Sequence, residues 1–276
     1  MTAGAGRAAK TEVGRYGAGP ALKLAVHEHG EGPAVLWIHG YTMDSTLWEP
    51  LWTLLPGFRH VGVDLPGHGG SGPIEPELTL PSLATALAEL AREREASRVV
   101  ALSFGCVAAL QLAIDHPDVV RTLAVAAPGI AGTPAEPGTD TRNRQLRLLA
   151  SIGGSGEQLT DLWMSSPPDI FAGTLDHPEV RERIRETILR HGWAELPTGG
   201  MRGLLSHRQT EADLRRITAR TLVVTGTRDM RAFADNAATI AGTVPGAQVI
   251  EVAAGHLPLL ERPEAVAGAL ARHLAG

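Results

Sequence analysis

Short apolar segments alternate with helical patterns along most of the chain, and this alternation limits the fold more than any other feature. Apolar runs suited to buried strands occupy residues 34–38, 59–63, 98–102, 119–126, 221–225 and 248–252, and residues 22–29 alternate apolar and polar side chains. Helical patterns lie between most of these runs, at residues 80–95, 104–115, 232–242 and 263–274. Strands that alternate with helices predict an α/β fold, with a mostly parallel central sheet and helices on both faces.

The alternation stops between residues 129 and 216. This stretch opens with several prolines and glycines and continues with short helical patterns at residues 141–152, 158–164, 178–191 and 210–217. We interpret residues 129–216 as a helical cap inserted between two strands of the core, because ordinary crossover connections, the alternative, are much shorter. The predicted domains are therefore a flexible N-terminal arm over residues 1–20, a core over residues 21–128 and 217–276, and the cap.

Composition narrows the class of partner. The chain has 25 basic and 30 acidic residues and a net charge of −5, which argues against a nucleic-acid-binding protein. No apolar run reaches the roughly 18 residues that a membrane span needs, and residues 1–20 lack the apolar segment of a signal peptide. The single cysteine, Cys106, fits a reducing compartment and is expected to be a buried structural thiol. We expect a cytoplasmic protein that acts on a small molecule, and the sequence is compatible with a homodimer.

A serine lies where a strand-like run gives way to a helical pattern. Ser103 stands between Ala101 and Gly105, and small residues on both sides are what a tight turn from strand to helix requires. The positive end of the following helix would point at the same place. A serine that caps a helix is the alternative explanation for this pattern alone. Its context makes Ser103 the candidate nucleophile.

Two later residues could activate this serine. A serine hydroxyl is a poor nucleophile at neutral pH, so it needs a base, and the base needs an orienting partner. Asp229 follows one strand-like run, and His256 follows the last one. The carboxyl ends of parallel strands meet at one edge of the sheet, so we expect both side chains near Ser103. Asp235 is a poorer candidate acid because it falls inside a helical pattern.

Backbone groups near the serine would complete such a site. His39, Gly40 and Tyr41 directly follow the buried run at residues 34–38. The backbone N–H groups of Tyr41 and Phe104 are the predicted oxyanion hole. We expect the His39 side chain to satisfy hydrogen bonds of its own loop.

Large apolar residues of the cap are the natural lining of a substrate pocket over the catalytic edge. The predicted lining consists of the cap residues Trp163, Met164, Phe171, Trp193 and Met201, together with Met230 of the core. A charged stretch of the cap interleaves glutamates with Arg181, Arg183, Arg185 and Arg190. It is interpreted as an exposed helix face, the alternative being one arginine turned inward to bind a substrate carboxylate. His27 and His29 share a strand face, but no acidic or cysteine cluster joins them, so we expect neither metal nor cofactor.

Sequence blocks in this order resemble the α/β-hydrolase superfamily, in its lid-bearing branch of esterases and epoxide hydrolases. The blocks are His39-Gly40, the Asp-Leu-Pro-Gly-His-Gly-Gly-Ser segment at residues 64–71, the turn around Ser103, and Gly255-His256 followed by Glu261-Arg-Pro-Glu264. The similarity covers about residues 22–274. It implies an α/β-hydrolase fold with Ser103 as nucleophile, His256 as base and Asp229 as orienting acid.

Departures from the family's patterns narrow the reaction. Epoxide hydrolases and haloalkane dehalogenases of this fold carry an aspartate where this chain has Ser103, and the glycine-rich oxyanion loop of carbon–carbon bond hydrolases is absent after Gly40. Ala101 stands where glycine is usual. We predict a cofactor-independent serine hydrolase that cleaves a carboxylic ester, lactone or thioester of a small to medium apolar substrate through an acyl-enzyme. Carbon–carbon bond hydrolysis, lyase or perhydrolase chemistry, and a ligand-binding receptor on this fold remain the alternatives.

Overall fold

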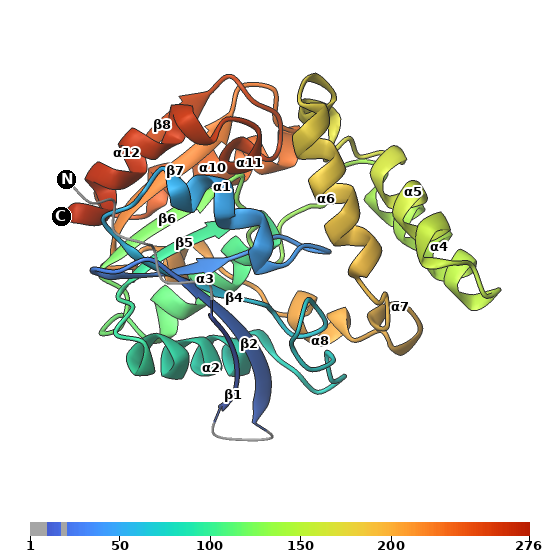
Figure 1. The fold of residues 1–276 in the computed structure, drawn as a ribbon, viewed down its shortest axis with the longest axis horizontal. Coiled ribbons are helices and arrows are strands. Elements are labelled where there is room, and N and C mark those ends of the chain that lie inside the picture. The colour runs from blue at the N-terminus through green and yellow to red at the C-terminus, as the bar shows by residue number, and fades with distance from the viewer. Residues whose placement is uncertain (1–9, 18–20) are drawn as a thin grey trace.

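An eight-stranded sheet forms the centre of the protein, which a computed structural model describes for residues 10–17 and 21–276 (Figure 1). The strand order is β1-β2-β4-β3-β5-β6-β7-β8. β2 pairs antiparallel with β1 and β4, and all other neighbours are parallel. The strands are β1 (Lys10–Tyr16), β2 (Leu22–His29), β3 (Ala34–Ile38), β4 (Arg59–Val63), β5 (Arg98–Leu102), β6 (Thr122–Ala126), β7 (Arg220–Gly226) and β8 (Gln248–Val252). The predicted α/β architecture is confirmed, and every predicted strand is present.

Helices cover both faces of this sheet. The helices of the core are α1 (Glu49–Thr53), α2 (Leu80–Glu93), α3 (Phe104–Asp115), α10 (Arg231–Thr243), α11 (Pro258–Glu261) and α12 (Pro263–Ala275), with a 3-10 turn η1 (Ser45–Trp48). Buried side chains of α2, α3 and α10 share one apolar core, and those of α1, α11 and α12 share the other. β5 contributes to both, since Val99 and Ala101 enter the first core while Val100 and Leu102 enter the second.

The chain between β6 and β7, residues 127–219, consists of short helices joined by turns and loops and is called the β6–β7 insertion below. It contains α4 (Thr139–Ser151), α5 (Gly156–Ser165), η2 (Ala172–Asp176), α6 (Pro178–Arg190), α7 (Glu195–Thr198), α8 (Met201–Leu205) and α9 (Glu211–Leu214). Figure 1 shows α4, α5, α6 and α7 together on one side of the sheet. Among the helices of the described residues, none has the length and apolar character to cross a membrane.

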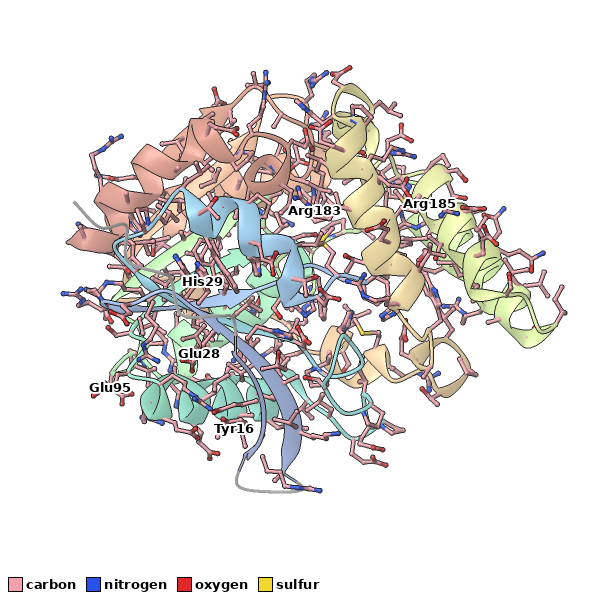
Figure 2. The ribbon with its side chains drawn as sticks, viewed as in Figure 1. Tyr16, Glu28, His29, Glu95, Arg183 and Arg185 are labelled. Atoms are coloured by element: carbon pink, nitrogen blue, oxygen red, sulfur yellow. The ribbon has the colours of Figure 1, made fainter. Side chains whose placement is uncertain are left out.

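The prediction of a flexible arm over residues 1–20 is wrong for Lys10–Tyr16, which form β1 and pair with residues 22–28 of β2. Arg94 holds this edge of the sheet, because its guanidinium binds Glu12 at 2.8 Å and Glu28 at 2.9 Å. Tyr16 packs into the core, and Figure 2 labels it together with Glu28. The strand is mostly polar, so its sequence carried no apolar signal. Residues 1–9 and 18–20 lie outside the described part of the chain.

A glycine at the start of α3 allows the strand-to-helix turn to pack against β3. A Cβ atom at Gly105 would lie 2.4 Å from the carbonyl oxygen of His39 and 2.6 Å from that of Ile38. Both neighbours are backbone atoms, which cannot rotate away as a side chain end would. The small residue predicted at this position is therefore a steric requirement.

Gly105→Ala should lower the free energy of unfolding by about 2–4 kcal/mol, because the added methyl group forces backbone atoms apart. Urea denaturation followed by circular dichroism measures this change. Gly242→Ala is the matched control, because Gly242 lies in α10 with nothing near its missing Cβ. Alanine there should stabilise the protein by about 0.5–1 kcal/mol through helix propensity. Equal effects of the two substitutions would contradict this account of Gly105.

Candidate active site

Ser103 lies at a sharp turn between β5 and α3. Its φ of 53° is in the left-handed region, which is uncommon for residues other than glycine. The turn is fixed on both sides, because the Ser103 N–H donates to Ala126 and its carbonyl accepts from Cys106 and Gly129. This strained geometry holds the hydroxyl out from the sheet, as in a nucleophile elbow.

The structure brings Ser103 together with the two other predicted residues. The Ser103 hydroxyl oxygen lies 2.8 Å from Nε2 of His256, and Nδ1 of His256 lies 2.8 Å from Oδ1 of Asp229. A carboxylate only accepts hydrogen bonds, so Nδ1 carries the proton and Nε2 is left to accept from the serine. The side chains of His256 and Asp229 are almost completely buried. This is the arrangement in which a histidine can remove the serine proton.

Separate groups position the histidine and the aspartate. The buried carboxylate of Glu261 accepts the backbone N–H of Gly255 at 2.6 Å and of Leu257 at 3.0 Å, which clamps the loop around His256. The Met230 N–H donates to Oδ1 of Asp229 at 2.7 Å. Asp235, the weaker candidate, instead lies at an exposed position of α10 in an ion pair with Arg231.

Two backbone N–H groups beside the serine have no hydrogen-bond acceptor among the described residues. They belong to Tyr41 and to Phe104, the first residue of α3, where helix geometry leaves the N–H free. Both residues line the same cavity as Ser103. The predicted oxyanion pair is thus placed beside the nucleophile candidate.

The buried side chain of His39 holds the loop that carries Tyr41. Nδ1 of His39 donates to the Gly40 carbonyl at 2.8 Å, while its Nε2 accepts the N–H of Leu65 at 2.9 Å. Only neutral imidazole can do both, and burial lowers the pKa of His39 accordingly. The His39 side chain therefore serves loop hydrogen bonds, as its position in the sequence predicted.

The 64–71 segment supports this loop through Asp64. Its carboxylate accepts hydrogen bonds from the N–H and hydroxyl of Ser45 and from the N–H of Gly70. Burial alone would raise the pKa of Asp64, but these bonds and the nearby His27 outweigh burial and lower it. The buried carboxylate thus stays ionised and ties β4 to the η1 turn.

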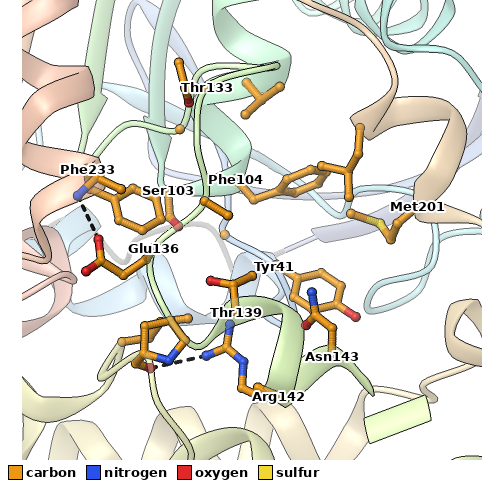
Figure 3. Close-up of a pocket in the computed structure, with 18 of the residues that line it drawn as sticks. Tyr41, Ser103, Phe104, Thr133, Glu136, Thr139, Arg142, Asn143, Met201 and Phe233 are labelled. Atoms are coloured by element: carbon orange, nitrogen blue, oxygen red, sulfur yellow. Dashed lines mark hydrogen bonds between the residues drawn. The ribbon is translucent and has the colours of Figure 1, made fainter. Parts of the chain in front are cut away.

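A cavity of about 650 Å³ opens beside Ser103, between the core and the β6–β7 insertion (Figure 3). That volume suits a small to medium organic ligand. Its apolar wall includes Phe104, Trp163, Met201 and Phe233, and Figure 3 shows Phe104, Met201 and Phe233 around Ser103. The ring of Phe233 also packs on His256, with centroids 4.1 Å apart.

Comparison with known proteins now assigns the family. The family described as "Alpha/beta hydrolase family" matches residues 35–269. The chain belongs to the alpha/beta hydrolase family. A thermophilic esterase from Thermogutta terrifontis superposes with a TM-score of 0.77 at 26% identity, over 96% of this chain and 98% of that one.

Two curated proteins are similar to most of this chain. The chain is 30% identical over 262 residues to the dihydrolipoyllysine-residue acetyltransferase component of the acetoin cleaving system of Cupriavidus necator. The match covers 88% of this chain but only 63% of that relative's length. A pimeloyl-[acyl-carrier protein] methyl ester esterase of Chromobacterium violaceum is 29% identical over 217 residues, which cover 77% of this chain and 82% of the relative.

Of the residues predicted to line a substrate pocket in this alpha/beta hydrolase, Trp163 and Met201 line the cavity beside Ser103. Those that do not line the cavity are Met164, Phe171, Trp193 and Met230. Phe171 and Trp193 pack edge-on behind Trp163, with ring centroids 6.1 and 6.3 Å away, and Met164 packs on the same apolar core. Met230 precedes α10, and the next turn supplies Phe233 instead.

Several cavity residues were not predicted from the sequence. The Tyr41 hydroxyl donates to buried Glu195, which also binds Nε2 of His191 at 3.0 Å. This contact joins the loop that carries Tyr41 to the β6–β7 insertion. The only sequence signal for it is the spacing of His191 and Glu195, which any helical surface pair shares. Arg142 also lines the cavity, whereas none of the arginines proposed from the sequence, between residues 181 and 190, does so.

Proposed function

We propose that this alpha/beta hydrolase is a serine hydrolase of carboxylic esters that works through an acyl-enzyme on Ser103. The observation that carries the proposal is the chain of hydrogen bonds from Ser103 through His256 to Asp229, set in a cavity beside unbonded backbone N–H groups. The Thermogutta esterase and the Chromobacterium methyl ester esterase support an ester as the substrate class.

The proposed reaction runs in two halves. His256 takes the proton of the Ser103 hydroxyl through Nε2 while the oxygen attacks the ester carbonyl carbon. The backbone N–H groups of Tyr41 and Phe104 hold the resulting oxyanion, and His256 returns the proton to the leaving alcohol. Water then attacks the acyl carbon while His256 takes its proton, and His256 returns that proton to the Ser103 oxygen as the acid leaves. Asp229 stabilises the imidazolium that forms in each half.

The β6–β7 insertion is proposed to act as the cap of this site, because it supplies Trp163 and Met201 to the cavity wall. Its mainly apolar lining favours an apolar chain next to the ester. We keep a cytoplasmic location as part of the proposal. It is supported by Cys106, the single cysteine of the chain, whose buried thiol donates to the Ala126 carbonyl.

Stopped-flow hydrolysis of p-nitrophenyl acetate tests the proposal. We expect turnover, together with covalent labelling by a fluorophosphonate that peptide mass spectrometry locates on Ser103. The loss of turnover should follow the labelled fraction one to one. Heat-denatured protein is the control, and it should be neither active nor labelled. Activity that survives complete labelling of Ser103, or an active protein that takes no label, would contradict the proposal.

A further inference from the structure

Arg142 is a buried cation on the wall of the candidate active site. Its side chain comes from α4 of the β6–β7 insertion and is only 3% exposed, yet it lines the same cavity as Ser103. Figure 3 shows Arg142, Thr139 and Ser103 around this cavity. Burial lowers the pKa of Arg142 to about 10, so the guanidinium still carries its charge at neutral pH.

This charge has no counter-ion among the described residues. One nitrogen, Nη1, donates to the Pro168 carbonyl at 3.3 Å, and Nε has no hydrogen-bond partner there at all. The guanidinium also lies 3.9 Å above the ring of Trp163. That contact offsets part of the cost of removing the charge from water, but it leaves most of the N–H donors unused. A buried guanidinium without an anion is the uncommon case in proteins.

Neither of the two carboxylates that line the cavity forms an ion pair with Arg142. Glu195 is bound to Tyr41 and His191, and Glu136 accepts the N–H of Ala232 at 2.7 Å. Neither carboxylate lies within ion-pair distance of Arg142.

Two further arginines add to the positive charge. Arg147 and Arg202 also line the cavity, and within the described part of the chain neither forms an ion pair. The cavity therefore combines apolar walls with a surplus of unpaired cations, the most deeply buried of which is Arg142.

We propose that Arg142 binds a carboxylate at the far end of the substrate, so that the substrate is an ester with an apolar chain and a terminal carboxylate. This inference deepens the proposed function and rests on it. The planar fork of arginine matches a carboxylate with two parallel N–H···O bonds. The apolar wall would hold the chain between this anchor and the ester at Ser103. An uncharged ester of the same length would leave the buried cation unpaired.

Matched pairs of esters test this inference. In the acyl series, mono-p-nitrophenyl esters of the dicarboxylic acids from succinate to suberate are compared with p-nitrophenyl esters of monocarboxylic acids of equal length. In the alcohol series, ω-acetoxy acids are compared with alkyl acetates. Wild type is measured beside Arg142→Met, which keeps the length and apolar packing of the side chain, and Arg142→Lys, which keeps the charge. Arg144→Met, at an exposed position of the same helix outside the cavity, is the control.

We expect Arg142→Met to lower kcat/KM about 10- to 100-fold for acid-bearing esters of at least one series, mainly through KM. The neutral partners should change less than about threefold by the same reasoning, because they make no bond to the guanidinium. Arg142→Lys should recover part of the loss, and Arg144→Met should behave as wild type. Thermal unfolding of Arg142→Met shows whether it is folded.

Other outcomes overturn the inference. An equal loss for charged and neutral esters means that Arg142 only supports Trp163, and an unchanged preference in both series means that it binds no carboxylate. If wild type hydrolyses no ester at all, the proposed function fails, and calorimetry of adipate binding then decides about Arg142. Binding weakened by Arg142→Met would support the carboxylate site, and no binding to wild type would refute it.

Discussion

Ser103→Ala is expected to lower kcat for p-nitrophenyl acetate by at least about 10⁴-fold, because it removes the atom that forms the acyl-enzyme. The hydroxyl lies 2.8 Å from Nε2 of His256, and among the described residues no other serine bonds to this ring. The proposed oxyanion hole and the cavity are left unchanged by this substitution, so a small residual rate above that of the uncatalysed reaction is expected. Initial rates of wild type and variant under saturating substrate, at equal protein concentration, measure the change.

Ser97→Ala provides the matched control for this substitution. Ser97 precedes β5, so it lies at the opposite end of the same strand from Ser103. It should retain wild-type kcat and full labelling, and both variants should unfold at nearly the wild-type temperature. A Ser103→Ala protein that is folded and fully active would contradict a mechanism in which Ser103 is the nucleophile.

The sequence predicted the central strands of the sheet well because these strands are buried on both faces. Ala34–Ile38 and Arg98–Leu102 are continuous apolar runs, and their observed bounds equal the predicted ones. β1 was missed because an edge strand buries one face at most, and its side chains are largely polar. A local pattern of apolar residues therefore predicts buried strands. It does not predict a strand such as β1, which is held by backbone pairing and by Arg94.

The candidate site, like the sheet, has a part that the sequence predicts and a part that it does not. Ser103, Asp229 and His256 could be predicted to meet because each follows a strand, and parallel strands end at one edge of the sheet. The cavity lining could not be predicted, since it depends on how the helices of the insertion rotate against the core. Trp163 faces the cavity while Trp193 packs behind it, although both are large, buried and aromatic. Arg142 had no distinguishing pattern, because its burial arises only when α4 meets α5 and Trp163.

Asp229→Asn is expected to lower kcat by about 10²–10⁴-fold. This substitution removes the charge of the acid but keeps its hydrogen bond to His256, so it measures the contribution of the charge. The amide oxygen of asparagine can still accept from His256 and from the Met230 N–H at the place of Oδ1, so the imidazole keeps its orientation. What disappears is the negative charge that stabilises the imidazolium. The new NH₂ group replaces Oδ2, which is buried without a partner, so stability should also fall by about 1–3 kcal/mol.

Asp229→Ala and Asp235→Asn complete the comparison of steady-state kcat. Alanine removes both the charge and the hydrogen bond, so its kcat should lie below that of Asp229→Asn, and the ratio measures what orientation alone contributes. Asp235→Asn should keep wild-type kcat, because Asp235 is exposed and pairs only with Arg231 among the described residues. The reverse result, with Asp235→Asn inactive and Asp229→Asn active, would identify Asp235 of α10 as the orienting acid. Equal activity of the alanine and asparagine variants at Asp229 would instead mean that charge is the whole contribution of this carboxylate, since the glutamate clamp on the His256 loop already fixes the ring.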